Sequence, residues 1–233
     1  MEQQPLAIAL TKGRILKQTL PLLEAVGIEP AENLESTRKL QVDTNIEGTK
    51  LLLVRASDVP AYVEYGGADI GVTGKDILLE HSGRGLYEPL DLGFGVCQMV
   101  VAAKPNVVNR LKVSDSSGQS SVSFDRTGVL RVATKYPEVA RRYFDRHGQQ
   151  VEIIKLYGSM ELAPLVGMAD LLVDIMETGA TLIANDLEVV ESICDISSRL
   201  IVNKASMKMK HQKIHQLIDG ISNAVWNCHL TVR

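Results

Sequence analysis

The chain has 233 residues and a 45% hydrophobic content, enough to bury the core of one large domain or of two lobes of about 100 residues each. A net charge of −3 and a 4% share of aromatic residues argue against a dedicated nucleic-acid binder, because basic surface and stacking platforms are both scarce. Three widely spaced cysteines suggest no disulfide framework, and neither a basic leader nor a long apolar run is present, so we expect a soluble, cytoplasmic protein.

Short apolar runs alternate with helix-period segments along the whole chain, which is typical of an α/β protein. Helical spacing is clearest at Ile15, Leu16, Leu20 and Leu23, and again in one packed terminal helix that we expect from Ser206 onward. The expected strands are 6–10, 51–54, 69–72, 97–103, 130–133, 151–154 and 171–175.

A basic string follows the first strand and opens the first helix. Lys12 supplies a point charge, Arg14 a planar fork for phosphate oxygens, and Gly13 lets the backbone approach a ligand. Such strings are common at helix starts, but the position between strand and helix favours a polyphosphate site.

Further basic residues come from the next two elements. Arg55 ends the strand 51–54, so it would lie at the carboxyl edge of a parallel sheet, where α/β proteins bind ligands. Arg38 and Lys39 follow a polar stretch, and their position fits a phosphate contact and a solvated surface equally well.

The glycine-rich segment 66–76 joins a helix end, a short strand and another turn. Thr73 and Gly74 are placed to donate hydrogen bonds to a phosphate. The segment is neither a Walker loop nor a Rossmann fingerprint, however, and Lys75 and Asp76 fit a solvated pair at a helix start equally well.

Two glycines, Gly93 and Gly95, stand just before the strand 97–103 and mark a crossing between lobes. With a return crossing near 191–195, we expect a discontinuous first lobe of residues 1–95 plus 193–233 and a second lobe of residues 96–192. The serine-rich stretch 105–128 predicts a flexible excursion within the second lobe.

The segment 170–187 predicts a site for a phosphorylated sugar. An apolar strand carries a carboxylate near its end and then breaks into a short polar loop before a new helical pattern. Hydroxyls and free N–H groups at such a helix start favour a phosphate, while carboxylates accept hydrogen bonds from ribose hydroxyls. The alternative is that Thr178 only caps a helix and the acids face water. The residues concerned are Asp174, Glu177, Thr178, Gly179, Ala180 and Thr181.

His211 and His215 have the spacing that chelates zinc from one helix face. No third ligand is recognisable, so we interpret them as exposed helix residues and predict no protein-held metal.

Taken together, these segments resemble the short form of the ATP phosphoribosyltransferase family, in the family's order and nearly from end to end. Two departures stand out. Asp186 replaces a usual glycine, which should alter helix geometry more than chemistry, and Thr11 replaces a common proline. The matching blocks are 8–14, 36–40, 52–76, 90–95, 131–144, 151–186 and 197–206.

The resemblance implies an α/β fold of two lobes of the periplasmic-binding-protein type (type II), with the active site in the interlobe cleft. It implies no C-terminal regulatory domain, because the chain ends shortly after the terminal helix. Similarity to the short form further implies assembly in a hetero-oligomer with a separate regulatory subunit related to histidyl-tRNA synthetase.

The implied activity is that of a pentosyltransferase of histidine biosynthesis, which joins phosphoribosyl pyrophosphate to N1 of ATP with substrate-bound Mg²⁺. Two other classes stay open on the residues: a non-catalytic solute-binding module and a phosphoribosyltransferase acting on a nucleobase. The implied catalytic residues are Arg14, Arg38 and Arg55. The implied substrate-binding residues are Lys12, Gly13, Lys39, Thr73, Gly74, Asp174, Glu177, Thr178, Gly179, Ala180 and Thr181.

Overall fold

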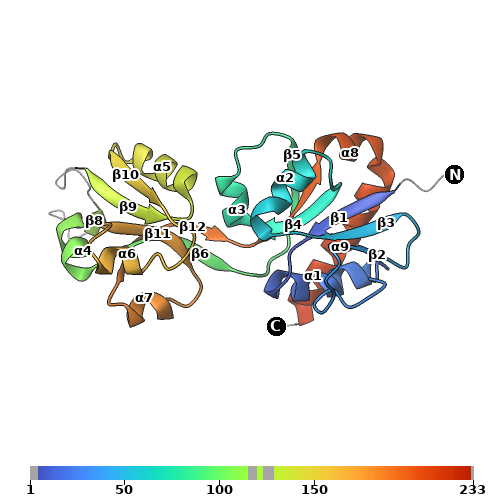
Figure 1. The fold of residues 1–233 in the computed structure, drawn as a ribbon, viewed down its shortest axis with the longest axis horizontal. Helices are drawn as coiled ribbons and strands as arrows, with labels where there is room; N and C mark the ends of the chain where they lie inside the picture. The colour runs from blue at the N-terminus through green and yellow to red at the C-terminus, as the bar shows by residue number, and fades with distance from the viewer. Residues whose placement is uncertain (1–4, 115–119, 123–128, 232–233) are drawn as a thin grey trace. The chain divides into compact units, whose positions relative to one another are not determined.

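The computed structural model describes residues 5–114, 120–122 and 129–231, which form two compact α/β units (Figure 1). The first unit comprises Met1–Gly95 and Ser197–Arg233, and the second comprises Val96–Ile196. The return crossing falls after residue 196 instead of 192, because the strand Glu188–Ile196 stays in the sheet of the second unit up to Ile196, which lies opposite Cys97. Among the described residues, no helix combines the length and apolar character needed to cross a lipid bilayer.

The first unit is built on a six-stranded mixed sheet with the order β2-β3-β1-β4-β13-β5. The central strands β3, β1 and β4 are parallel, whereas β2, β13 and β5 run antiparallel to their neighbours. The strands are β1 (Leu6–Leu10), β2 (Gln41–Asp43), β3 (Thr49–Leu53), β4 (Ile70–Gly74), β5 (Leu86–Asp91) and β13 (Ser198–Asn203). The helices are α1 (Arg14–Ala25), the 3-10 helix η1 (Ala56–Asp58), α2 (Val59–Glu64), α3 (Lys75–Glu80), α8 (Lys204–Met209) and α9 (His211–Thr231).

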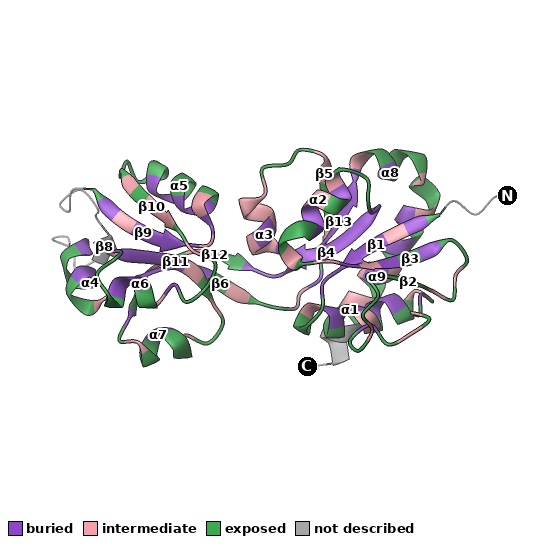
Figure 2. Cartoon of the chain, in the orientation of Figure 1, coloured by how far each residue is buried: buried purple, intermediate pink, exposed green. Residues whose placement is uncertain are grey.

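Alternation along β1 assigns its side chains to the two faces of this sheet. Leu6, Ile8 and Leu10 pack with the buried leucines and isoleucines of α1 and α9, whereas Ala9 packs against Val59 of α2. Small residues are needed on the α2 face, because a Cβ on Gly71 would lie only 2.7 Å from Val59 Cγ1. Figure 2 shows the buried strands between helices whose outer surfaces are exposed.

The C-terminal segment is two helices, not the single helix expected from Ser206. Asn203 caps α8, since its Oδ1 accepts hydrogen bonds from the backbone N–H groups of Ala205 (2.8 Å) and Ser206 (2.9 Å). The chain then turns at Lys210 before α9 begins. Apolar periodicity continues across this turn, so it gave no sign of the break.

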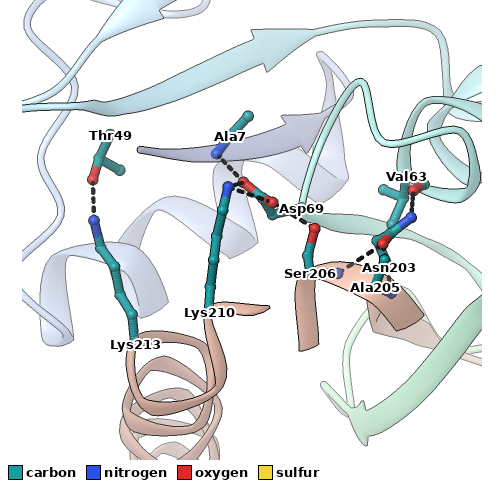
Figure 3. A network of polar contacts seen from close by, with 9 residues as sticks. All are labelled: Ala7, Thr49, Val63, Asp69, Asn203, Ala205, Ser206, Lys210 and Lys213. Atoms are coloured by element: carbon teal, nitrogen blue, oxygen red, sulfur yellow. Dashed lines mark hydrogen bonds and ion pairs between the residues drawn. The ribbon is translucent and has the colours of Figure 1, made fainter. Parts of the chain in front are cut away.

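Lys210 belongs to a buried polar network at the amino-terminal edge of the sheet (Figure 3). Its Nζ lies 2.7 and 2.8 Å from the two carboxylate oxygens of Asp69, a residue only 7% exposed. Asp69 also accepts hydrogen bonds from the Ser206 hydroxyl (2.6 Å) and from the Ala7 backbone N–H (2.8 Å). Burial, and after it the charge of Lys210, lowers the pKa of the neighbouring Lys213. Asp69 therefore joins α8, the turn that leads into α9, and β1 at one point.

The second unit is built on a five-stranded sheet with the order β10-β9-β11-β6-β12 and a separate pair, β7-β8. Strands β10, β9 and β11 are parallel, and β6 runs antiparallel between β11 and β12. The strands are β6 (Cys97–Ala103), β7 (Lys112–Ser114), β8 (Ser120–Val122), β9 (Leu130–Thr134), β10 (Val151–Lys155), β11 (Leu171–Met176) and β12 (Glu188–Ile196). The helices are α4 (Pro105–Leu111), α5 (Pro137–Arg146), α6 (Leu162–Leu165) and α7 (Ala180–Ala184).

The seven expected strands are confirmed in position and type across both units. The prediction of a flexible excursion over 105–128 is wrong for its first part, because Pro105–Leu111 forms α4 with Val107, Val108 and Leu111 buried. The rest of that stretch includes 115–119 and 123–128, which lie outside the described residues.

Asp186, the departure from the family's glycine, has a left-handed backbone with φ of 51°. It follows α7, where the Leu187 N–H bonds to the Leu182 carbonyl (2.9 Å) and the Asp186 N–H to that of Ile183 (3.2 Å). This is a Schellman motif, whose left-handed position favours glycine and tolerates aspartate.

We expect the Asp186→Gly variant to be more stable than the Asp186→Ala variant by about 1–2 kcal/mol, because alanine carries the steric cost of a left-handed backbone and glycine does not. Urea unfolding of both variants measures the difference. Equal stabilities would show that the left-handed backbone costs nothing at this position.

Candidate active site

The basic string of the first unit and Arg55 lie at one edge of its sheet. Because β1, β3 and β4 are parallel, their carboxyl ends meet there, with Leu10 opposite Leu53 and Ala9 opposite Gly71. Lys12, Gly13 and Arg14 follow β1, and Arg55 follows β3 after one residue. The observed strand topology therefore places these residues at a carboxyl edge of the sheet, as expected from the sequence.

A pocket of about 760 Å³ opens at this edge within the first unit. Lys12 and Arg55 both contribute to its lining, together with Asp58. The exposed side chains of Leu40 and Tyr62 form part of its apolar wall. The remaining lining residues are Thr11, Gln41, Leu52, Leu53 and Val54. An apolar wall beside two cations suits a ligand with a flat apolar part and a charged part.

The backbone around Arg55 is fixed by a turn. Its carbonyl accepts hydrogen bonds from the N–H groups of Asp58 (2.9 Å) and Val59 (3.2 Å), where η1 and α2 begin. The side chain is exposed, and no carboxylate of the described residues forms an ion pair with it. Arg55 therefore presents an uncompensated positive charge at the pocket.

Carboxylates neutralise other cations of the same unit. Lys39 Nζ lies 2.6 Å from Glu32 Oε1, and this hydrogen bond lowers the pKa of Glu32. Lys75 Nζ lies 2.6 Å from Glu88 Oε2, so its partner is Glu88, not the neighbouring acid considered from the sequence. By contrast, Lys12 Nζ lies 2.5 Å from the Thr37 carbonyl and so holds the loop before Arg38 beside the first helix.

Thr73 and Gly74, which the sequence predicted as phosphate donors, are both buried in the first unit. Thr73 is 0% exposed, and its hydroxyl donates a hydrogen bond to the Ala56 carbonyl at 3.3 Å. Gly74 is also buried, at the start of α3. In this conformation Thr73 connects β4 to η1, and its hydroxyl is used within the protein.

In the second unit, the carboxyl ends of β9, β10 and β11 meet at one edge in the same way. Asp174 lies near the end of β11 and is half-buried, and one of its carboxylate oxygens accepts a hydrogen bond from the Ile175 N–H (2.8 Å). Glu177 follows in the exposed loop. Both carboxylates are thus placed beside the segment that we interpret as a phosphate loop.

That loop turns sharply at Gly179, whose φ of 76° is left-handed. The Thr178 hydroxyl accepts a long hydrogen bond of 3.4 Å from the Ala180 N–H. Both Thr178 and Thr181 are exposed, and α7 begins at Ala180 and has only five residues. The loop therefore offers two exposed hydroxyls and the first N–H groups of a short helix to solvent.

Two lysines at this edge were not identified from the sequence. Lys155 ends β10 opposite Thr134, and Lys135 follows Thr134 directly. The Thr134 hydroxyl donates to the Val173 carbonyl (2.7 Å) and accepts from the Tyr136 N–H (2.9 Å), which fixes the backbone beside Lys135. The rule that selected Arg55, a cation directly after an apolar strand, would have found both lysines.

The two histidines of α9 lie with their ring centroids 4.1 Å apart and line a different pocket of the first unit. Among the described residues, no group of three or more His, Cys, Asp or Glu side chains is arranged to hold a metal ion.

Comparisons with known proteins agree on one family. The sequence model of the ATP phosphoribosyltransferase family matches residues 55–223. An ATP phosphoribosyltransferase of Nitrosococcus oceani is 54% identical over 226 residues, which cover 97% of this chain and 99% of that protein.

Solved structures extend this likeness to the fold. The structure of an ATP phosphoribosyl transferase (HisG:HisZ) complex from Thermotoga maritima matches with a TM-score of 0.79 and 31% identity, over 95% of this chain and 99% of that chain. The periplasmic aliphatic sulphonate binding protein SsuA of Escherichia coli matches with a TM-score of 0.55 and 15% identity, over 96% of this chain and 73% of that chain. The two-lobed fold expected from the sequence is thereby confirmed.

Proposed function

The chain belongs to the ATP phosphoribosyltransferase family, and on that premise we propose which residues serve each substrate. The reaction transfers the phosphoribosyl group of phosphoribosyl pyrophosphate to N1 of ATP. Its products are N1-(5-phospho-β-D-ribosyl)-ATP and pyrophosphate, and it is the first step of histidine biosynthesis. Two anionic substrates must therefore be held and aligned.

Phosphoribosyl pyrophosphate binds the loop after β11 in this proposal. The observation that carries the assignment is the pair of exposed threonine hydroxyls around the left-handed Gly179, directly after a strand that ends in Asp174. Thr178, Gly179, Ala180 and Thr181 hold the 5′-phosphate through hydroxyl and N–H donors. Asp174 and Glu177 accept hydrogen bonds from the two ribose hydroxyls.

The polyphosphate groups interact with the cations of the first unit. Lys12 and Arg55 line its pocket, and the apolar wall formed by Leu40 and Tyr62 suits the adenine ring of ATP. Arg14 and Arg38 add positive charge from the neighbouring segments, with Gly13 allowing a close backbone approach. Of the other assigned residues, Lys39, Thr73 and Gly74 reach a substrate only if they leave the contacts and burial described above.

Catalysis rests on alignment and on charge stabilisation. The lone pair of adenine N1 attacks the anomeric carbon from the side opposite the leaving group, and pyrophosphate departs with the electron pair of the broken C–O bond. This attack inverts the anomeric carbon. The uncompensated charge of Arg55 stabilises the negative charge that develops on pyrophosphate, and no residue is assigned as a general base.

Mg²⁺ in this scheme would arrive with the substrate and would be held more by substrate and water than by the protein. The donor set fits this role, because Asp174 and Glu177 are hard oxygen donors beside the proposed sugar loop, and Mg²⁺ is commonly held by one or two carboxylates plus substrate phosphates. When bound, Mg²⁺ would neutralise charge on the leaving group.

The partner in this proposal is a separate regulatory subunit related to histidyl-tRNA synthetase, and the assembly is a hetero-oligomer in the cytoplasm. Support comes from the Thermotoga maritima relative, whose structure is that of a HisG:HisZ complex. The solution mass of the chain, measured with and without such a subunit, tests the assembly.

Activity is tested by mixing the purified chain with phosphoribosyl pyrophosphate and either ATP or free nucleobases, and following the ultraviolet absorbance of the product. We expect turnover of phosphoribosyl pyrophosphate with ATP and none with the free nucleobases. Turnover with a free base would instead indicate a nucleobase phosphoribosyltransferase, and binding without turnover would indicate a solute-binding module.

The Thr178→Val variant should raise the KM for phosphoribosyl pyrophosphate by about 10-fold or more, because it removes a hydroxyl donor to a charged phosphate while keeping the side-chain shape. Steady-state kinetics should show a much smaller change in kcat. Thr178→Ser, which keeps the hydroxyl, is the matched control. An unchanged KM in the valine variant would remove Thr178 from the proposed loop.

A further inference from the structure

Two segments connect the units, and each is short. The outgoing connection is Leu92–Val96, between β5 and β6, and the returning connection is the single residue Ser197, between β12 and β13. They run side by side, because β5 pairs with β13 in the first unit and β6 pairs with β12 in the second. Two backbone hydrogen bonds join them, from the Leu92 N–H to the Ser198 carbonyl (2.9 Å) and from the Ser198 N–H to the Phe94 carbonyl (2.8 Å).

Asp91 is the side chain that contacts both connections. Its Oδ1 accepts a hydrogen bond from the Gly93 backbone N–H (2.9 Å) in the outgoing connection. The same oxygen accepts a hydrogen bond from the hydroxyl of Ser197 (2.8 Å), which forms the returning one. One carboxylate oxygen thus joins two chain segments that are 106 residues apart in sequence.

An arginine holds the other oxygen of Asp91 in place. Arg199 lies opposite Asp91 in the β5–β13 register, and its Nη2 is 2.9 Å from Asp91 Oδ2. Its Nη1 is 3.2 Å from Glu88 Oε1, and Glu88 in turn binds Lys75. Because both ends of the Asp91 carboxylate are engaged, its orientation toward the connections is restricted.

The backbone next to Asp91 leaves little room for an alternative arrangement. Gly93 and Gly95 have left-handed φ values of 69° and 64°. A Cβ at Gly95 would lie 2.9 Å from the Ser198 hydroxyl, so the outgoing connection passes directly against the returning chain.

We propose that Asp91 is a positioning residue that pins the two connections to each other at their first-unit end. With the pin in place, the chain can turn only beyond the pinned residues, at 95–96 and at 196. Without it, only the two backbone hydrogen bonds at Leu92, Phe94 and Ser198 join the connections, so the units sample a wider range of arrangements.

The consequence for turnover rests on the proposed function, in which each unit holds one substrate. A wider range of arrangements lowers the fraction of molecules with both substrates aligned, so kcat falls, by about 10-fold for Asp91→Ala. The KM for phosphoribosyl pyrophosphate should stay near its original value, because the loop after β11 is untouched.

Single-molecule energy transfer measures the range of arrangements without reference to substrates. One dye is placed on each unit through Tyr65→Cys and Tyr157→Cys, since these side chains are 86% and 83% exposed. The native cysteines Cys97, Cys194 and Cys228 are replaced by serine, and labelled chains are diluted into an excess of unlabelled chains so that each signal comes from one chain.

We expect the distance distribution to widen in Asp91→Ala and, to a smaller extent, in Ser197→Ala. Glu88→Gln is the matched control, because Glu88 binds the same arginine but contacts neither connection, and its distribution should match that of the parent. Identical distributions in all variants would overturn the proposal, as would equal widening in Glu88→Gln. If Asp91→Ala does not fold, Ser197→Ala decides the question, because it removes only one hydroxyl contact. A wider distribution with unchanged kcat would retain the pin and reject the placement of the substrates on separate units.

Discussion

The Arg55→Ala variant is expected to lose about 100-fold or more in kcat, because in the proposed mechanism it removes the charge that stabilises the departing pyrophosphate. Arg55 is the strongest candidate for this role on structural grounds. Its backbone is fixed by the turn into η1, its side chain lines the pocket with Lys12, and no described carboxylate neutralises it. Steady-state kinetics with both substrates measure the loss.

Two further variants separate charge from geometry at Arg55. Arg55→Lys keeps the charge but loses the planar fork, so it should recover only part of the activity. Arg110→Ala also removes one positive charge, but from an exposed position on α4 of the second unit that is not part of the proposed site. It should leave kcat unchanged. Near-normal turnover of Arg55→Ala, or an equal loss in Arg110→Ala, would contradict a specific role of Arg55.

The Asp69→Ala variant is expected to lower the free energy of unfolding by about 2–3 kcal/mol, because it leaves the partly buried ammonium group of Lys210 without its partner. The Ser206 hydroxyl and the Ala7 N–H also lose their acceptor. Chemical denaturation measures the loss. The exposed Asp219→Ala on α9 should change stability by no more than about 0.5 kcal/mol.

A double variant identifies the cause of this loss. Asp69→Ala with Lys210→Met removes the uncompensated charge, so its destabilisation should be smaller than the sum of the two single changes. Strict additivity would show that the two side chains contribute independently and that the ion pair in Figure 3 is not what holds α9 to the sheet.

Local patterns predicted seven strands correctly. They missed β13, although its residues Leu200, Ile201 and Val202 form a buried apolar run, and they also missed strands that expose many of their residues. β1, β3, β4, β6, β9, β10 and β11 were all found as apolar runs. β2 and β5 lie at sheet edges and expose most of their residues, and β12 alternates weakly between exposed and buried positions. Without a continuous apolar run or a clear alternation, such strands have no distinctive local signal.

The candidate residues were found for a local reason as well. Lys12, Arg55 and the loop at Thr178 each come shortly after a strand of a parallel set, and parallel strands bring such positions to the carboxyl edge of their own sheet. Which cations stay available was not predictable, since Lys39 and Lys75 meet carboxylates through turns and pairings that the local pattern does not encode.

The amino-acid sequence by itself determined the α/β class, the family and where the proposed ligand-binding segments lie along the chain, because these depend on the order of apolar runs, glycines and charged residues. Only the tertiary structure decided which charges remain uncompensated and which contacts join distant segments. The carboxylates of Asp69 and Asp91 each bind groups more than 100 residues away, Lys210 and Ser197 respectively. Such partners meet only after the sheet of the first unit has formed, because its pairing brings the two distant stretches of chain within hydrogen-bonding distance.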